Sequence, residues 1–241
     1  MSEPFLRIIL SCEHGGHRIP VAYRPLFAGQ EESLATHRGY DIGILPFARF
    51  LARELEAPLH AAEVSRLLVD LNRSRRSPTL FSEVTWQLPA GERAAILRRY
   101  YDPYREAVTQ AVAEGRRNGR VLHLSVHSFT PEMHGVVRRA DIGLLYAPAR
   151  PAEAEFCRRW QAEINRLDPA LRVRRNYPYR GVSDCLVTTL RRRFDGERYL
   201  GVEIEVNQKL PQGEAGLWHH VRQVLLESLR VAATRLDNPP L

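Results

Sequence analysis

The chain has 241 residues, of which 44% are hydrophobic and 26% are charged, and its formal net charge is +7. This length suits one large α/β domain, and no apolar run is long enough to cross a bilayer. The opening residues, MSEP, are not the start of a signal peptide, so we expect a cytoplasmic protein with no membrane partner. Cys12, Cys157 and Cys185 are too widely spaced for a disulfide framework or a thiolate zinc site, which leaves histidines and carboxylates as metal ligands.

The positive net charge of the chain has three interpretations. Arginine far outnumbers lysine, and a solvated, arginine-rich surface is the plainest explanation. Arginines that converge on an anionic substrate are a second explanation, and contacts to nucleic-acid phosphates are a third. The third would use the clusters Arg73/Arg75/Arg76, Arg172/Arg174/Arg175 and Arg191/Arg192/Arg193. No nucleic-acid-binding motif accompanies them, so no nucleic-acid partner is expected.

Apolar runs alternate with segments of helical spacing along the whole chain. In chain order the pattern predicts a strand at 5–12, a helix at 43–56, a short buried strand within 59–71, a helix at 90–118 broken near Asp102-Pro103, strands at 120–127 and 141–147, a helix at 151–167, a strand at 198–207 and a helix at 214–235. The alternation favours a single α/β domain over 1–241, with a mixed, mostly parallel central sheet and helices on both faces.

Polar clusters stand directly after the predicted strands. In sheets of this kind, ligands bind beyond the carboxyl ends of the strands, where side chains from several strands meet. The clusters are Glu13/His14, Asp70/Asn72/Arg73, His127/Ser128 and Glu205/Asn207. Their shared position is the strongest functional signal that the residues themselves carry.

Two histidines at strand ends are candidate metal ligands. His14 and His127 each follow an apolar run and precede a small residue, which leaves room for a ligand. A lone histidine in this position is more often a hydrogen-bonding residue, but two of them with acids nearby suit an open catalytic zinc site. Such a site takes three protein ligands and keeps one position for water. The third ligand stays open among His17, Asp41 and Glu13, because spacing alone does not decide between them.

The segment SRLLVDLNRS, residues 65–74, ends in polar side chains after an apolar run. Asp70 is suited to orient a ligating imidazole through its second ring nitrogen. Asn72 and Arg73, with Arg66, are suited to hold a substrate carboxylate, for which arginine supplies a two-pronged fork. The alternative is a surface ion-pair patch, which buried polar ends on an apolar strand make less favourable.

Two later segments also have a functional and a plain interpretation. GVEIEVNQ, residues 201–208, places Glu203 and Glu205 on one strand face, where a glutamate could move a proton from water to a leaving nitrogen. The alternative there is an exposed edge strand. NYPYRG, residues 176–181, predicts either a rigid pocket wall that carries Tyr179 and Arg180 or an ordinary turn.

Seven motifs occur together and in order: CEHGG, DIG at Asp41, SRLLVDLNR, HSFTP, ADIGLLY, NYPYRG and EIEVNQ. With them the chain resembles the N-formylglutamate amidohydrolase family over nearly its whole length. More distantly it is similar to zinc carboxypeptidases and aminoacylases, which implies a related hydrolase fold. Glu13 and Gly15 stand where better-characterised members of the family have proline and serine, so the chain looks like a divergent branch.

The resemblance implies roles for individual residues. His14 and His127 would be ligands of one zinc ion per chain, and Asp70 would support a ligand. Glu205 would be the general base, because it lies two residues before Asn207 as the family's E-x-N pattern requires. The candidate substrate-binding residues are Arg66, Asn72, Arg73, Tyr179, Arg180 and Asn207, and Arg73 is also placed in catalysis.

The expected activity is zinc-dependent cleavage of the amide C–N bond in a small, anionic N-acyl amino acid. The resemblance implies N-formyl-L-glutamate as substrate, formate and L-glutamate as products, and a place in amino-acid catabolism. A second hypothesis is a carboxypeptidase-like enzyme that trims short peptides with the same metal site. A third is a basic binding protein whose metal site has decayed.

Overall fold

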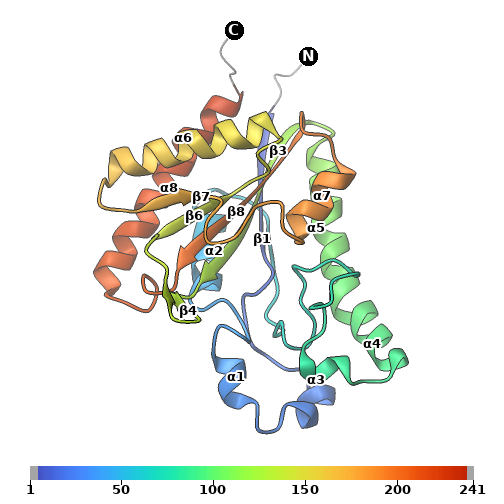
Figure 1. The fold of residues 1–241 in the computed structure, drawn as a ribbon. Helices are drawn as coiled ribbons and strands as arrows, with labels where there is room; N and C mark the ends of the chain where they lie inside the picture. The colour runs from blue at the N-terminus through green and yellow to red at the C-terminus, as the bar shows by residue number, and fades with distance from the viewer. Residues whose placement is uncertain (1–4, 238–241) are drawn as a thin grey trace.

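The computed structural model describes residues 5–237, which are built around a six-stranded sheet (Figure 1). The strand order is β2 (Leu59–Ala61), β1 (Phe5–Cys12), β3 (Gly119–Phe129), β8 (Tyr199–Asn207), β6 (Ile142–Leu145) and β7 (Val173–Arg175). Neighbouring strands pair in parallel except β6 and β8, which pair antiparallel. The predicted mixed, mostly parallel sheet is confirmed. Residues 1–4, on which the expectation about a signal peptide rests, lie outside the described residues.

Helices cover both faces of the sheet, as predicted (Figure 1). On one face lie α2 (Ile44–Glu54), α6 (Pro151–Leu167) and α8 (Ala215–Asp237), which share the largest apolar core with the sheet. On the other face lie α5 (Asp102–Gly115) and α7 (Leu186–Arg193), which share a smaller core with it. Within residues 5–237, no helix has both the length and the apolar character that a membrane span requires.

The central strand β3 divides its side chains between these two faces. The even-numbered residues from Leu122 to Val126 belong to the large core with α2, α6 and α8. Because side chains alternate along a strand, His123, Ser125 and His127 project from the opposite face, and none is more than 3% exposed. A buried polar row needs hydrogen-bonding partners, so this face of β3 is where a functional site belongs.

The predicted strand within 59–71 is wrong for most of its length. Only Leu59–Ala61 pairs with β1, and residues 62–71 form turns and irregular segments apart from one isolated bridge at Val64. Leu68 and Val69 pack in a second core that contains no residue of the six-stranded sheet. An apolar run of this length looks the same in sequence whether a sheet or a set of turns buries it.

The helix predicted at 90–118 consists of three consecutive elements: α4 (Ala90–Ile96), a π-helical segment η2 (Leu97–Tyr101) and α5. Pro103 lies in the first turn of α5, where a missing N–H is tolerated. The chain therefore passes from the π-helical segment into α5 without a break. The remaining short elements are η1 (Val21–Phe27), α1 (Glu31–Ala35), α3 (Glu83–Trp86), β4 (Glu132–Met133) and β5 (Val136–Val137).

Candidate metal centre and its pocket

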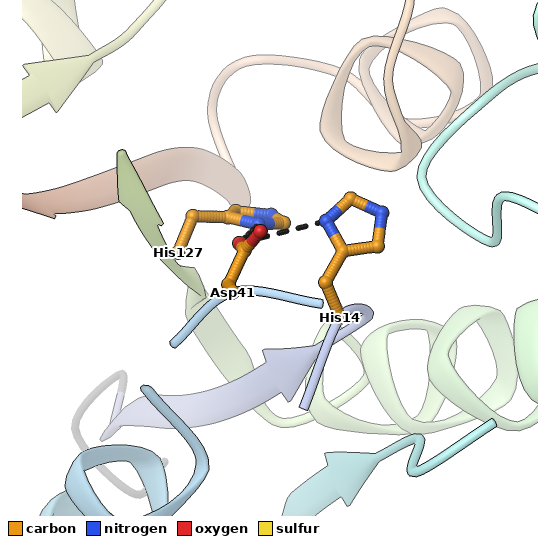
Figure 2. A group of neighbouring side chains, drawn as sticks. All are labelled: His14, Asp41 and His127. Carbon is orange, nitrogen blue, oxygen red and sulfur yellow. Dashed lines mark hydrogen bonds and ion pairs between the residues drawn. The ribbon is translucent and has the colours of Figure 1, made fainter. Parts of the chain in front are cut away.

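Three buried side chains form a group that is able to hold a metal ion at the carboxyl ends of β1 and β3 (Figure 2). His14 follows β1, Asp41 precedes α2, and His127 belongs to β3. One ligand atom from each residue lies within 4.8 Å of the other two. Among residues 5–237, no other group of three or more His, Cys, Asp or Glu side chains has this geometry.

Strand pairing brings the two histidines together. β1 and β3 pair in parallel with Ser11 opposite Ser125, so the chain after β1 emerges beside His127. The two imidazole centroids are 5.1 Å apart. Asp41 is fixed beside them by its backbone N–H, which donates a hydrogen bond of 2.9 Å to the carbonyl oxygen of His14.

Glycines allow the close approach of the loops that carry these residues. Gly43, in the DIG motif, has a φ of +76° at the entry to α2, and a Cβ there would lie 2.4 Å from the Cβ of Pro211. In the CEHGG motif, a Cβ on Gly16 would lie 2.7 Å from the carbonyl oxygen of Glu63. Any side chain at either position would displace the loop that carries Asp41 or His14.

The donor set of the group fits zinc. The Nε2 atom of His14 lies 2.7 Å from Asp70 Oδ1, and its Nδ1 atom is buried without a hydrogen-bond partner, 3.5 Å from Asp41 Oδ2. The Nε2 atom of His127 lies 3.0 Å from Glu13 Oε2, and its Nδ1 atom lies 2.9 Å from Asp41 Oδ2. Each imidazole thus has one nitrogen held by a carboxylate and the other turned toward Asp41, which is the arrangement of metal-binding histidines. Two imidazoles and one carboxylate leave a fourth, open position on a tetrahedral zinc ion.

The charges around the group keep its carboxylates ionised. Burial alone would raise the pKa of Asp41, but His14 and His127 outweigh it and hold that pKa below the ordinary range. Burial is likewise outweighed at Asp70, whose pKa Arg66 and His14 lower. Arg66 donates to Asp70 Oδ2 at 2.7 Å and to Asp41 Oδ1 at 3.5 Å, so one guanidinium compensates two carboxylates.

The metal-binding group opens into a pocket of about 690 Å³, within the range of small-molecule sites. Most of the residues predicted from the sequence line it: His14, Asp41, Arg66, Asp70, Asn72, Arg73, His127, Tyr179, Arg180 and Glu205. Apolar side chains, among them Phe81, Phe129 and Met133, complete the wall. The structure therefore gathers these predicted residues from six separate segments of the chain around one cavity.

Strand pairing also places Glu205 beside the metal-binding group, because it lies opposite His127 in the ladder between β3 and β8. Its side chain is buried, and its Oε2 atom has no hydrogen-bond partner among the described residues. Burial raises the pKa of Glu205 to about 8, against the opposing effect of His127 and with a further contribution from Asp41. Glu203 also lines the pocket, but its Oε1 atom accepts a bond of 3.4 Å from the Cys185 thiol.

The candidate carboxylate binders differ in how much of their hydrogen-bonding capacity is used. Asn72 accepts a bond of 2.8 Å from the N–H of Leu186, and its Nδ2 atom lies 3.3 Å from His127 Nε2. Arg73 uses Nη1 to donate to the carbonyl oxygen of Asp184 at 2.6 Å, while its Nη2 atom has no partner among residues 5–237. Arg180 is exposed at the pocket, and its guanidinium makes no hydrogen bond or ion pair with any described residue.

Two candidates from the sequence lie away from the pocket. His17 is exposed and packs against Tyr40, with ring centroids 4.6 Å apart. Asn207 is completely buried, and its Nδ2 atom donates to two backbone carbonyl oxygens, one of them that of Arg138. Substrate binding by Asn207 therefore does not fit its position, and the next residue, Gln208, lines the pocket instead.

The residues behind His127 were not predicted from the sequence. Ser125 Oγ lies 2.9 Å from His127 Nε2 and donates to Glu13 Oε2 at 2.7 Å. Tyr104, from α5, donates to the other oxygen of Glu13 at 2.9 Å. The row of polar residues with period two in β3 was a signal for Ser125, whereas nothing near Tyr104 in the sequence pointed to it.

Comparisons with known proteins bear on the fold and the family of the chain. The family model described as N-formylglutamate amidohydrolase matches residues 6–211. A gene product of Agrobacterium tumefaciens of known crystal structure is 28% identical, with a TM-score of 0.82 over 96% of this chain and 92% of that chain. An N-formylglutamate amidohydrolase from Ralstonia eutropha is 20% identical, with a TM-score of 0.70 over 97% of this chain and 95% of that chain. None of the curated proteins compared matches the chain.

The α/β fold and the family match together place the protein among the amidohydrolases, enzymes that cleave amide C–N bonds. More narrowly, the chain belongs to the N-formylglutamate amidohydrolase family, since the match covers most of its length. The family resemblance of the sequence motifs is thereby confirmed.

Proposed function

We propose that this protein is a zinc-dependent amidohydrolase of small, anionic N-acyl amino acids, with N-formyl-L-glutamate as the first substrate to test. The observation that carries the proposal is the convergence of His14, Asp41 and His127 at the floor of a pocket that also holds the buried carboxyl of Glu205. Asp41 is thus our proposal for the third ligand, in preference to His17 and Glu13. The family to which the chain belongs supports the reaction class.

The chain's own residues account for the proton transfers of the reaction. Zinc bound by the three ligands would supply Lewis acidity, which polarises the amide carbonyl and acidifies water. Glu205 takes a proton from the attacking water as the new C–O bond forms. When the C–N bond breaks, Glu205 returns that proton to the leaving nitrogen, so N-formyl-L-glutamate and water give formate and L-glutamate. Burial raises the pKa of Glu205 from the range of an exposed glutamate toward neutral pH, which suits a group that accepts and then donates a proton.

Arginines at the pocket supply the anion-binding groups that such a substrate needs. Arg73 lies next to the metal-binding group and keeps Nη2 free for a substrate carboxylate. Arg180 stands on the pocket wall with its whole guanidinium unpaired among the described residues. Arg66 stays committed to Asp70 and Asp41, so its contribution is mainly to the charge balance of the pocket.

A second candidate function uses the same residues on a larger substrate. The cavity of about 690 Å³ has room for more than a formyl group, which favours a test of short peptides in parallel. A carboxypeptidase-like enzyme would need the same metal, the same Glu205 and an arginine for the terminal carboxylate. The two candidates therefore differ only in the acyl group that the pocket accepts.

The deciding experiment begins with the zinc content of purified wild type and of the double variant His14→Ala/His127→Ala. His17→Ala is the matched control, because it removes an exposed histidine close to His14 in sequence. We expect about one zinc per chain in wild type and in His17→Ala, and none in the double variant. Zinc-loaded wild type is then offered N-formyl-, N-acetyl- and N-glycyl-L-glutamate, and the released amine is measured. A wild type that neither contains nor takes up zinc would overturn the proposal.

A further inference from the structure

Glu13 is the neighbour of His14 in the chain, but its side chain serves the other histidine. The carboxylate is 1% exposed and lies behind His127, on the side of the imidazole away from Asp41. Three groups from two other elements donate to it or contact it: Ser125 Oγ at 2.7 Å, His127 Nε2 at 3.0 Å and Tyr104 Oη at 2.9 Å. A carboxylate held by this many partners has one fixed orientation.

The hydrogen-bond inventory then determines which nitrogen of His127 carries a hydrogen. An ionised carboxylate only accepts hydrogen bonds, and Glu13 Oε2 at 3.0 Å is closer to His127 Nε2 than the amide donor Asn72 Nδ2 at 3.3 Å, so Nε2 is assigned the hydrogen and donates to Glu13. The Nδ1 atom, on the far side of the ring, is then the one free to present a lone pair beside Asp41 Oδ2. Asp70 does the same for His14, whose Nε2 lies 2.7 Å from Asp70 Oδ1. Each of the two imidazoles therefore has its own buried carboxylate.

The two carboxylates differ in what balances their charge. Asp70 is paired with Arg66, whose guanidinium lies 2.7 Å away. Among residues 5–237, no arginine or lysine pairs with Glu13, and its one ion-pair partner is His127. When the Nδ1 atom of His127 is a neutral ligand, the negative charge of Glu13 is balanced through the ring by the cation that the ring binds. Removing Glu13 should therefore weaken the hold of His127 on a cation.

We infer that Glu13 is a positioning residue, which orients His127 and strengthens it as a metal ligand without binding the metal itself. The inference rests on the proposed zinc site. Losses of this kind of support typically weaken metal binding by about 10–100-fold.

The test is the zinc affinity of the full-length protein, measured by competition with a chromophoric chelator. We expect Glu13→Ala to bind zinc about 10–100-fold more weakly than wild type. Glu13→Gln should lie between the two, because its amide oxygen still accepts the hydrogen of His127 Nε2 although the charge is gone. Glu153→Gln is the matched control: Glu153 is also a buried glutamate, 1% exposed, but its carboxylate accepts from Arg191 and lies outside the pocket. It should lower stability and leave zinc affinity close to that of wild type.

A second readout separates a supporting residue from a ligand. The visible absorption of the cobalt(II)-substituted protein reports the ligand set, so its band positions should be the same in wild type and Glu13→Gln. A changed spectrum would show that Glu13 is itself a ligand, and equal zinc affinity in wild type and both Glu13 variants would show that it supports nothing. Either result overturns the inference and leaves the amidohydrolase proposal standing. Absence of zinc binding in wild type would remove both.

Discussion

His14 Nε2 lies 2.7 Å from Asp70 Oδ1, and the same carboxylate accepts a bond of 2.7 Å from Arg66 through its other oxygen. The histidine that follows β1 is thus oriented by a side chain 56 positions later in the chain. The turn that carries Asp70 pairs with no strand of the sheet. The backbone N–H of Asp70 instead donates to the carbonyl oxygen of Leu80 at 2.8 Å. The metal-binding group therefore depends on a segment outside the sheet.

From this relationship we expect Asp70→Asn to weaken zinc binding by about 10–100-fold. The amide can no longer balance Arg66, and it accepts from His14 less strongly than a carboxylate does. The measurement is chelator competition on the folded protein. Asp184→Asn is the control: the Asp184 carboxylate accepts from the backbone N–H of Ser74 and has no hydrogen bond to either histidine among the described residues. An unchanged zinc affinity in Asp70→Asn would show that the Asp70 carboxylate is not needed to orient His14.

Glu205→Gln should lower kcat by about 10²–10⁴-fold, because the amide cannot take a proton from water. Its zinc content should stay at the wild-type level, since Glu205 is not among the three candidate ligands. Glu203→Gln, two residues earlier on the same strand face, should cost much less. A Glu205→Gln variant with wild-type kcat would remove Glu205 from the mechanism.

Arg73→Ala should lower kcat/KM by about 10–100-fold for N-formyl-L-glutamate, mainly through KM, because a hydrogen bond to a charged group contributes about 1.5–3 kcal/mol. For an analogue whose α-carboxylate is blocked as an amide, wild type and variant should perform alike. Arg75→Ala is the matched control, since Arg75 pairs with Asp102 on the exposed surface. Equal losses with both substrates would point to a structural role for Arg73.

His123 should make the stability of the fold depend on pH below neutrality. Burial lowers its pKa to about 4, from an ordinary value of 6.5, so the folded chain holds this ring neutral. Between pH 6.5 and 4 the unfolded chain binds a proton at this ring that the folded chain does not bind. Stability from this group is therefore fully present above pH 6.5 and is lost as the pH falls toward 4, by about 3 kcal/mol in all.

The measurement is urea unfolding of wild type and His123→Gln at several pH values between 7.5 and 4. The variant is expected to be less stable at pH 7.5, because Ser11 and Tyr199 lose a partner. Its stability should nevertheless fall less steeply with decreasing pH. Parallel curves for the two proteins would contradict the assignment of this pH dependence to His123.

Much of the fold could be predicted because the residues that the hydrophobic pattern marks as buried are buried in the structure. The strand at 5–12 and the helix at 151–167 have the bounds predicted from the sequence, since each is a clean apolar run or a clean amphipathic stretch. The segment after Ala61 could not be predicted, because its apolar residues are buried by turns in a second core. Whether a short apolar run joins a sheet depends on tertiary partners that the run itself does not specify.

The candidate site shows the same division. His14, His127 and Glu205 were found because polar residues at the ends of apolar strands share one edge of the sheet. Asp70 also lies at the site, although the segment before it forms turns and not the predicted strand. The choice of Asp41 from the three candidate third ligands was not accessible, because it depends on a backbone hydrogen bond to His14 across a long loop. Asn207, for which the family resemblance implied substrate binding, instead donates to the backbone carbonyl oxygens of Arg138 and Ala140, a contact that the motif alone did not indicate.

The three proposed ligands come from segments far apart in the chain, and they meet only when β1 and β3 are paired. An ion held by them binds the native state and has no equivalent site on the unfolded chain. By linkage, free zinc at a hundred times its Kd would then add about 2.7 kcal/mol to the free energy of unfolding. The concentration of free zinc would then influence the fraction of chains that are unfolded and open to proteolysis. Depletion of zinc would therefore shorten the lifetime of the protein as well as abolish the proposed hydrolysis.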